Sequence, residues 1–227
     1  MPRKTAPKAE SKMPKAESKI RMDGCLSPAE FGPVYAQKWK QSRDKGDPVS
    51  LLLIDLDDLH ELNAKHGKEE GDRAINATIA ALAKSAKADG WTLARIGGDE
   101  FALLAPGVAT EAAFLRADTL RREVDAALAK AIQHGTCTAS IGVASSPRDA
   151  KAPDELMRKA DLALYAAKEQ GGSGVALTPG DDMVLKSSYY STAQLGRLRS
   201  LAERTKKKEA VLLREALDDL LRKHERS

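Results

Sequence analysis

The sequence lacks the features that would suit it to a membrane or to the cell exterior. No apolar run among its 227 residues approaches the roughly 18 residues that a membrane-spanning helix needs. The first residues, from Met1 on, lead into a lysine-rich stretch without an apolar segment, so we expect no secretory signal. Cysteine is limited to Cys25 and Cys137, which we interpret as free thiols in a reducing compartment. These absences predict a cytoplasmic protein that does not contact membranes.

Aromatic residues are also scarce, at 4% of the chain, whereas hydrophobic residues of all kinds make up 42%. That amount of apolar material is enough for a packed core, which excludes disorder of the whole chain. The core must then consist mainly of Leu, Ala, Val and Ile. The length suits one domain of ordinary size with a small additional module.

No single sign of charge dominates the chain, whose net charge is +4, but the charge is unevenly distributed. Residues 1–22 hold seven basic and two acidic residues, and residues 183–227 hold eleven and six, so each end carries +5. Residues 23–182 hold nineteen basic and twenty-five acidic residues, a net charge of −6. Basic ends of this kind suit contact with a polyanion, although they could equally serve only to aid solubility.

The first 22 residues contain a short repeat, Pro-Lys-Ala-Glu-Ser-Lys, at 7–12 and again at 14–19. Because this stretch has almost no large apolar residue, it cannot offset the entropy lost on ordering. We therefore expect a disordered basic tail over residues 1–22.

From Ser27 onward, apolar periodicity predicts helices that alternate with strands. Ser27-Pro28 is typical of a helix start, and Gly97-Gly98 is typical of the turn of a hairpin. The predicted helices are 28–45, 69–87, 111–132 and 153–170, and the predicted strands are 49–54, 91–96, 101–105, 137–145 and 174–177. This order predicts an α+β fold with a mixed sheet and helices packed against it. Residues 178–182 are expected to form a linker to a separate module, residues 183–227.

Acidic residues and glycines occur together where two predicted strands end. Asp55 directly follows a buried strand, and Asp99 and Glu100 follow Gly97-Gly98 in the hairpin turn. If the two strands are neighbours, these carboxylates converge at one edge of the sheet, where they would suit Mg²⁺ bound together with substrate phosphates. The glycines would let a ligand lie against the backbone. On spacing alone, an ordinary acidic turn explains the same residues.

Longer motifs bear on these two interpretations. The segment Arg95-Ile-Gly-Gly-Asp-Glu-Phe101 carries the signature of the GGDEF family, the diguanylate cyclases. Further blocks resemble that family in the same order, at 53–63 with Gly71-Asp72, at 138–143 and at 160–168. Residues 23–177 are therefore identified as resembling a GGDEF domain. The resemblance implies a nucleotidyl-cyclase-like (ferredoxin-like) sandwich with a five-stranded central sheet.

The same resemblance implies an activity, the condensation of two GTP molecules into cyclic di-GMP and pyrophosphate by a homodimer that holds one GTP in each subunit. It implies that Asp55, Asp99 and Glu100 are the catalytic residues. Mg²⁺ (or Mn²⁺) would be held by Asp55, Asp99 and the carbonyl of Leu56. The residues implied to bind GTP are Asn63 and Asp72 at the guanine edge, Gly97 and Gly98 in the turn, and Lys168 at the phosphates.

The sequence departs from the family pattern at two positions expected to contact phosphate. His60 stands where members often have Lys, and Gly172 where they often have Arg. The family's opening block is eroded at residues 26–29, and its Arg-x-x-Asp product site is absent from residues 87–91. His60, Gly172 and the eroded opening block favour an alternative, in which a weakly active or inactive GGDEF body senses GTP or cyclic di-GMP within a DNA-binding transcriptional regulator.

The C-terminal module has a short β-prone segment at 186–190 and two amphipathic helices expected at 192–204 and 209–223. About 45 residues cannot bury both apolar helix faces alone, so we expect a homodimer. With its run Leu-Leu-Arg-Glu-Ala-Leu at 212–217, the module resembles the ribbon-helix-helix family of DNA-binding proteins.

That second resemblance implies that paired strands enter the major groove of duplex DNA. The residues that would face the bases are Lys186, Ser188 and Tyr190, and those that would contact phosphates are Lys206, Lys207 and Lys208. The alternatives are a helical hairpin that serves only to dimerise and a module that binds protein instead of DNA.

Overall fold

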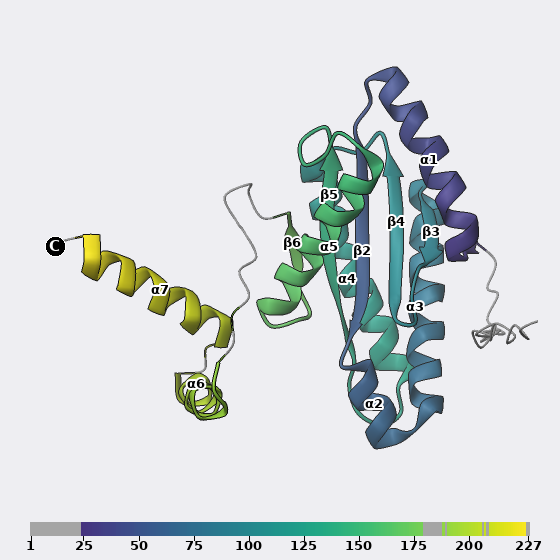
Figure 1. The fold of residues 1–227 in the computed structure, drawn as a ribbon. Helices are drawn as coiled ribbons and strands as arrows, with labels where there is room; N and C mark the ends of the chain where they lie inside the picture. Colours follow the sequence, from purple (N-terminus) through teal and green to yellow (C-terminus); the bar gives the residue numbers. More distant parts are fainter. Residues whose placement is uncertain (1–23, 179–187, 189, 206, 208, 226–227) are drawn as a thin grey trace, which may run out of the picture.

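A computed structural model describes residues 24–178, 188, 190–205, 207 and 209–225 of the chain (Figure 1). Its first part is built on one six-stranded sheet, composed of β1 (Cys25–Leu26), β2 (Val49–Asp57), β3 (Thr92–Arg95), β4 (Glu100–Pro106), β5 (Thr138–Ser146) and β6 (Val175–Leu177). The strand order is β1-β3-β4-β2-β5-β6. β1 pairs with β3 and β5 with β6 in parallel, and the other neighbours are antiparallel. β4 and β2 are therefore the two central strands.

Helices cover both faces of this sheet (Figure 1). One face packs against α3 (Lys68–Asp89) and α4 (Thr110–Ala131), and the other against α1 (Pro28–Lys45) and α5 (Pro153–Glu169). A short helix, α2 (Leu59–His66), follows β2 directly. The side chains of β2 alternate between the two faces because successive residues of a strand point to opposite sides. We call this unit, residues 24–178, the sheet domain.

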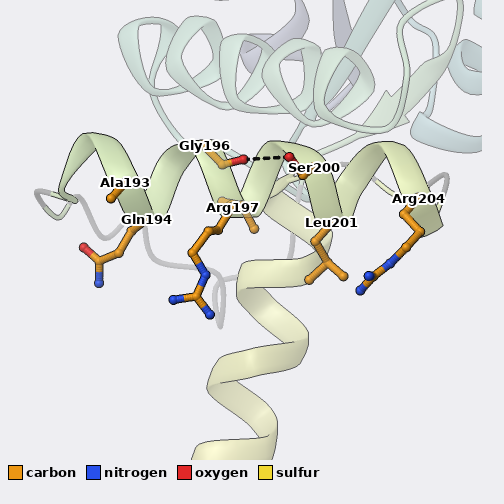
Figure 2. A pocket seen from close by; sticks show the side chains of 8 residues that line it. Ala193, Gln194, Gly196, Arg197, Ser200, Leu201 and Arg204 are labelled. Carbon is orange, nitrogen blue, oxygen red and sulfur yellow. Dashed lines mark hydrogen bonds between the residues drawn. The ribbon is translucent and has the colours of Figure 1, made fainter.

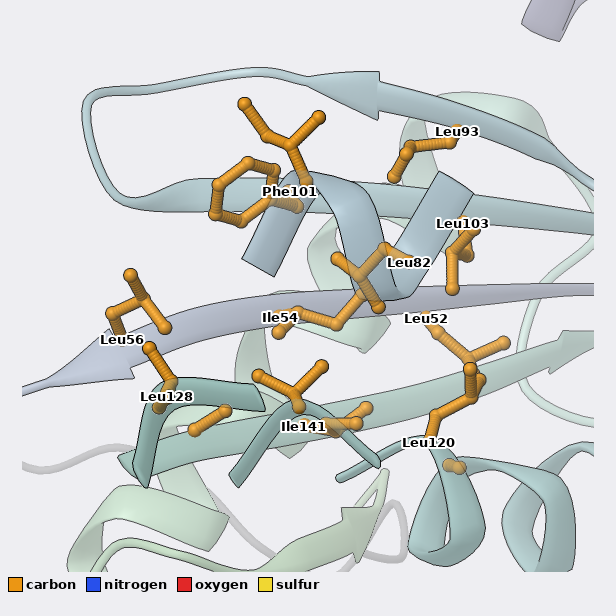
Figure 3. Packing of buried hydrophobic residues seen from close by; sticks show 14 of the residues in the cluster. Leu52, Ile54, Leu56, Leu82, Leu93, Phe101, Leu103, Leu120, Leu128 and Ile141 are labelled. Carbon is orange, nitrogen blue, oxygen red and sulfur yellow. The ribbon is translucent and has the colours of Figure 1, made fainter. Parts of the chain in front are cut away.

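Two buried clusters hold these layers together. Figure 3 shows the cluster on the α3–α4 face, where Leu52, Ile54 and Phe101 lie among leucines of both helices and are fully buried. The opposite cluster is centred on Leu51 and Leu53 and includes the rings of α1. α5 approaches β5 so closely that a Cβ atom at Gly142 would lie 2.1 Å from the backbone nitrogen of Leu164. Both faces of β2 are thus buried, and its end is fixed in place.

The predicted α+β fold is confirmed, with two differences. The sheet has six strands instead of five, because Cys25–Leu26 pairs with β3, and a two-residue strand is too short to show a periodic pattern. The helix α2 was not predicted, because its eight residues are mostly polar and follow an acidic cluster. Cys25 and Cys137 are free thiols.

Two further helices, α6 (Thr192–Thr205) and α7 (Glu209–Glu225), form the C-terminal part, and they contact each other. We call them the helical pair. Ser188 and Tyr190 belong to neither a helix nor a strand. The predicted tail 1–22, most of the linker 178–182, and Lys186, Lys206 and Lys208 lie outside the described residues. No helix within the described ranges has the length and apolar character needed to cross a membrane.

Candidate active site

Three carboxylates meet at one end of the sheet. Asp55, near the end of β2, is the direct cross-strand partner of Glu100, the first residue of β4. The backbone nitrogen of Leu56 donates a hydrogen bond to the carbonyl of Asp99 across 3.3 Å. The strands that carry the two acidic segments are therefore neighbours, which is the condition under which their acidic residues lie together.

The turn that carries Asp99 is fixed by its own hydrogen bonds. The backbone nitrogens of Ile96 and Gly97 both donate to the carbonyl of Glu100, at 2.9 and 3.2 Å. The Arg95 guanidinium donates to the carbonyl of Gly98, with Nε at 3.2 Å. Sequence reasoning gave Arg95 no role, although its place two residues before the glycines is the signal that could have found it.

The two glycines of this turn are needed for different reasons. A Cβ atom at Gly97 would lie 2.5 Å from Oε2 of Glu100, so any other residue there would displace that carboxylate. A Cβ atom at Gly98 would have no neighbour within 4 Å. The space over Gly98 is therefore open, and a ligand can approach the backbone there.

The predicted phosphate contact, Lys168, lies against the predicted metal ligand. Its Nζ is 2.6 Å from Oδ1 of Asp55, in an ion pair that joins the last turn of α5 to β2. Asp55 is buried, and this burial raises the pKa of its carboxyl group, with a smaller opposing effect from Lys168. The negative charges of Asp99 and Glu100 raise the same pKa further. This end of the sheet thus concentrates negative charge and attracts cations.

A second aspartate of β2, Asp57, is fully engaged by protein donors. Its Oδ2 accepts hydrogen bonds from Oγ1 of Thr138 and from the backbone nitrogen of Ser173, each at 2.8 Å. Its Oδ1 accepts one from Oγ of Ser140, also at 2.8 Å. Asp57 therefore holds the loop after α5 in place, and its carboxylate is occupied by these contacts.

These residues fit a divalent cation that arrives together with a ligand. Within the described ranges, no group of three or more His, Cys, Asp or Glu side chains is arranged to hold a metal ion. Asp55, however, already holds the ammonium group of Lys168, which shows that this carboxylate accepts a cation. Mg²⁺ usually takes one or two protein carboxylates and completes its shell with water and phosphate oxygens. Asp55 and Asp99 supply two such carboxylates, with the Leu56 amide bonded to the Asp99 carbonyl.

The two residues predicted to bind guanine lie where α2 and α3 meet. The Oδ1 atom of Asn63 is buried and has no hydrogen-bond partner among the described residues. Gly71 lies against this oxygen, since a Cβ atom at Gly71 would be 2.1 Å from it. The next residue, Asp72, is exposed. A buried acceptor without a donor is costly, and such groups in native structures call for an explanation. Because Gly71 covers this oxygen, a ligand could reach it only after a shift of α2 or α3.

Of the lysines predicted to contact DNA, the structure describes only Lys207. Lys207, between the helices, has its Nζ 2.6 Å from Oε1 of Glu215, so this predicted phosphate contact pairs within the chain. Figure 2 shows Arg197, Leu201 and Arg204 along one side of α6, with Gly196 and Ser200 on the other. Both arginines are exposed. They are basic residues that sequence reasoning did not single out, since it considered only the lysine run and the short strand.

Comparisons with known proteins cover both parts of the chain. Residues 31–174 match the family model described as diguanylate cyclase, GGDEF domain, and residues 187–225 match that of the ribbon-helix-helix domain. Diguanylate cyclase A of Treponema denticola is 31% identical over 141 residues, which are 60% of this chain and 37% of that protein. Response regulator PleD of Caulobacter vibrioides is 33% identical over 134 residues, 57% of this chain and 29% of PleD.

The fold also matches solved structures. The GGDEF domain of DgcB from Caulobacter crescentus, in complex with c-di-GMP, aligns with a TM-score of 0.62 at 24% identity. The alignment covers 74% of this chain and all of that one. This likeness establishes the architecture of the sheet domain, whereas the chain spans no more than 37% of the two curated relatives.

Proposed function

The chain belongs to the GGDEF domain family, and we propose that it condenses two GTP molecules into cyclic di-GMP and pyrophosphate. The observation that carries this proposal is the convergence of Asp55, Asp99 and Glu100 beside the open space over Gly98. The matches to diguanylate cyclases support the reaction type.

In this proposal the chain's own residues bind and orient the nucleotide. Asn63 and Asp72 bind the guanine edge, and α2 or α3 would have to shift for the buried Oδ1 of Asn63 to accept a hydrogen bond from it. Asp55, Asp99 and the carbonyl of Leu56 would hold Mg²⁺ (or Mn²⁺), which when bound neutralises phosphate charge and makes a hydroxyl more acidic. Glu100 lies across from Asp55, where it can accept the proton of the attacking 3′-hydroxyl.

The reaction requires two copies of the chain. In each of two steps, a 3′-oxygen attacks the α-phosphorus of the other GTP, the bond to the β-phosphate breaks, and pyrophosphate leaves. Because each subunit holds one GTP, two active sites must face each other. The helical pair supports such an arrangement, since it leaves apolar side chains exposed that a second copy could cover.

Product formation by Asp99→Ala tests the proposal. Wild-type protein should convert GTP to cyclic di-GMP in the presence of Mg²⁺, and Asp99→Ala should lower the rate by about a hundredfold to a thousandfold. Asp44→Ala removes an exposed aspartate of α1 and serves as the matched control. Circular dichroism should show that both variants keep the fold. No product from micromolar wild-type enzyme over hours would contradict the proposal.

A second candidate function is a sensor with little turnover. It is favoured by Gly172, which has no side chain to reach a phosphate and lies where a Cβ atom would be 3.2 Å from the Asp57 carboxylate. It is also favoured by His60, which stands exposed at the start of α2. Binding of GTP or cyclic di-GMP without product formation, measured by calorimetry, would select this function.

We further infer that the dimer binds duplex DNA. This inference is supported by the ribbon-helix-helix match, by the charge of +5 over residues 183–227 and by the exposed Arg197 and Arg204. Fluorescence anisotropy should show affinity that falls steeply with salt, because each phosphate contact releases about one counterion.

Two sets of variants separate the proposed DNA contacts. Replacing Lys206, Lys207 and Lys208 together should weaken binding to all sequences alike, whereas replacing Lys186 or Tyr190 should reduce discrimination between sequences. Ser188 belongs with the second set. Absence of binding to any duplex at low salt would leave a module that only dimerises.

A further inference from the structure

The cation nearest to Asp55 comes from the protein itself. Nζ of Lys168 lies 2.6 Å from Oδ1 of Asp55, and the Lys168 side chain keeps 40% of its surface exposed while that of Asp55 keeps 11%. Asp55 is therefore the fixed partner at the end of β2. Lys168 is the partner that has room to turn.

The position of Lys168 is set by the packing of α5. The helix lies against Gly142, where the backbone of Leu164 leaves no space for a Cβ atom. Lys168 follows Leu164 by four residues, so it lies one turn further along the same face of the helix. The backbone of Lys168 is thus anchored, and any movement must come from its long flexible side chain.

Three carboxylates at one end of a sheet repel one another unless a cation joins them. In this structure the ammonium group supplies that positive charge, and a metal ion on Asp55 would have to take its place. Two cations cannot both lie at hydrogen-bonding distance from the same oxygen without repelling each other. Removal of the ammonium group from Asp55 therefore has to be linked to the arrival of another ligand that attracts it.

We propose that Lys168 is an exchangeable counter-ion, which occupies the metal's place on Asp55 until a metal-bound nucleoside triphosphate arrives and then turns to the phosphates. This rests on the proposed function of the site. The site is thereby closed to the metal alone, and metal and nucleotide bind with strong positive coupling. Such coupling is reciprocal, so the nucleotide raises the affinity for metal by the same factor as the metal raises the affinity for nucleotide.

Binding of Mn²⁺ in the absence of nucleotide tests the exchange directly. Electron paramagnetic resonance counts free Mn²⁺ and gives the affinity of the intact protein without any turnover. Lys168→Met should bind Mn²⁺ at least about tenfold more tightly than wild type, since one neighbouring positive charge has been removed. Lys168→Arg keeps the charge and should bind Mn²⁺ as weakly as wild type.

Lys65→Met is the matched control, because Lys65 forms an exposed ion pair with Glu61 at 2.5 Å on α2. It should leave Mn²⁺ binding unchanged. A second arm adds a GTP analogue with a methylene group between the α- and β-phosphorus atoms. The analogue should raise Mn²⁺ affinity strongly in wild type and much less in Lys168→Met.

The outcomes separate the two levels of the proposal. Suppose that wild type binds Mn²⁺ with the analogue but Lys168→Met binds Mn²⁺ alone no better than wild type. The proposed exchange of Lys168 is then wrong, while the proposed metal–nucleotide site is kept. If wild type fails to bind Mn²⁺ even with the analogue, the metal-dependent site is wrong and the exchange falls with it. Equal tightening in Lys65→Met would also overturn the exchange, because it would show a general effect of charge.

Discussion

The sheet domain and the helical pair bury their leucines to very different extents. In the sheet domain, Leu51 and Leu52 on successive positions of β2 are both fully buried, one on each face. In the helical pair, Leu195 is 44% exposed, and Leu217 and Leu220 are 55% and 54% exposed. The sheet domain thus has a buried core of its own, although Leu115 and Leu162 are exposed on its helices, whereas no residue of α6 is buried.

This difference shows where each part gets its stability. The sheet domain has two internal clusters and is expected to unfold as a unit of its own. The helical pair has too little internal contact to be stable alone, and burial of its leucines by a second copy would provide what is missing. If the helical pair dimerises as proposed, we expect the stability of the first part to be independent of protein concentration and that of the second part to depend on it.

Gly142→Ala should have the largest effect, because it disrupts the packing of α5 on the sheet, on which the internal core of the sheet domain depends. The added methyl group would lie 2.1 Å and 2.4 Å from backbone atoms of Leu164 and Ala160, which cannot move without shifting α5. We expect a loss of at least about 3 kcal/mol in the free energy of unfolding. Urea unfolding followed by tryptophan fluorescence measures it, since both tryptophans, Trp39 and Trp91, lie in the sheet domain. An unchanged midpoint would contradict the close packing.

Deletion of residues 183–227 separates the two parts and should have the next largest effect. The shortened chain should keep its cooperative tryptophan transition and become monomeric in analytical ultracentrifugation. At micromolar concentration its cyclase rate should fall by about a hundredfold, because two sites held together meet at a far higher effective concentration. A shortened chain that remains fully active at the same concentration would show that the sheet domains pair without the helical pair.

Gly196→Ala is the counterpart of Gly142→Ala in the helical pair, and its effect should have the opposite sign. A Cβ atom at Gly196 would meet nothing within 4 Å, and the residue lies inside α6. Alanine should stabilise the helix by about 0.5–1 kcal/mol. Far-UV circular dichroism should show a later loss of helix, while the tryptophan transition stays unchanged. Destabilisation would mean that this side of α6 is covered in the dimer.

Glu70→Gln sharpens the comparison through its dependence on pH. Glu70 is buried in the sheet domain, where hydrogen bonds from Arg73 at 2.7 and 3.2 Å and from the backbone of Gln133 lower the pKa of its carboxyl group to about 2. Because the folded pKa lies below the unfolded value of about 4.3, this group contributes stability above that pH and loses it as pH falls toward 2.

Thermal melts should therefore show Glu70→Gln less stable than wild type at neutral pH, with the gap closing between about pH 4.5 and pH 2. The control is Glu215→Gln in the helical pair, whose ion pair with Lys207 is about half exposed. Exposed pairs contribute little, so its melts should follow those of wild type at every pH. A gap that persists at pH 2 would contradict the role of the Glu70 charge.

The accuracy with which the sequence predicts helices and strands also differs between the sheet domain and the helical pair. In the sheet domain, the periodic patterns of β2 and of the long helices predict their positions to within a few residues, because two-sided burial enforces the pattern. The short elements β1 and α2 escape prediction, since their pairing depends on neighbours distant in sequence. In the helical pair both helices are predicted, but the surface that would cover their exposed leucines is not.

At the candidate site, the sequence predicts the types of residue present better than it predicts the contacts between them. The pattern predicts where the two strands end, but spacing alone does not place Asp55 beside Asp99, because that depends on the pairing of β2 with β4. The ion pair of Lys168 with Asp55 could not be predicted, since it depends on how closely α5 packs on Gly142. Lys207 likewise finds a partner in Glu215, eight residues later, through the turn between two helices.

The position of β2 between two antiparallel neighbours has a consequence for motion. Every residue from Val49 to Asp55 is paired on both sides, with β4 and with β5. Amide protons so placed exchange with solvent only when the whole domain opens, whereas those of the turn at Gly98 exchange through small local openings. The carboxylate of Asp55 is thus attached to the slowest-exchanging part of the chain, and that of Asp99 to a much faster one. A ligand that joins the two would be seen first as slowed exchange in the turn.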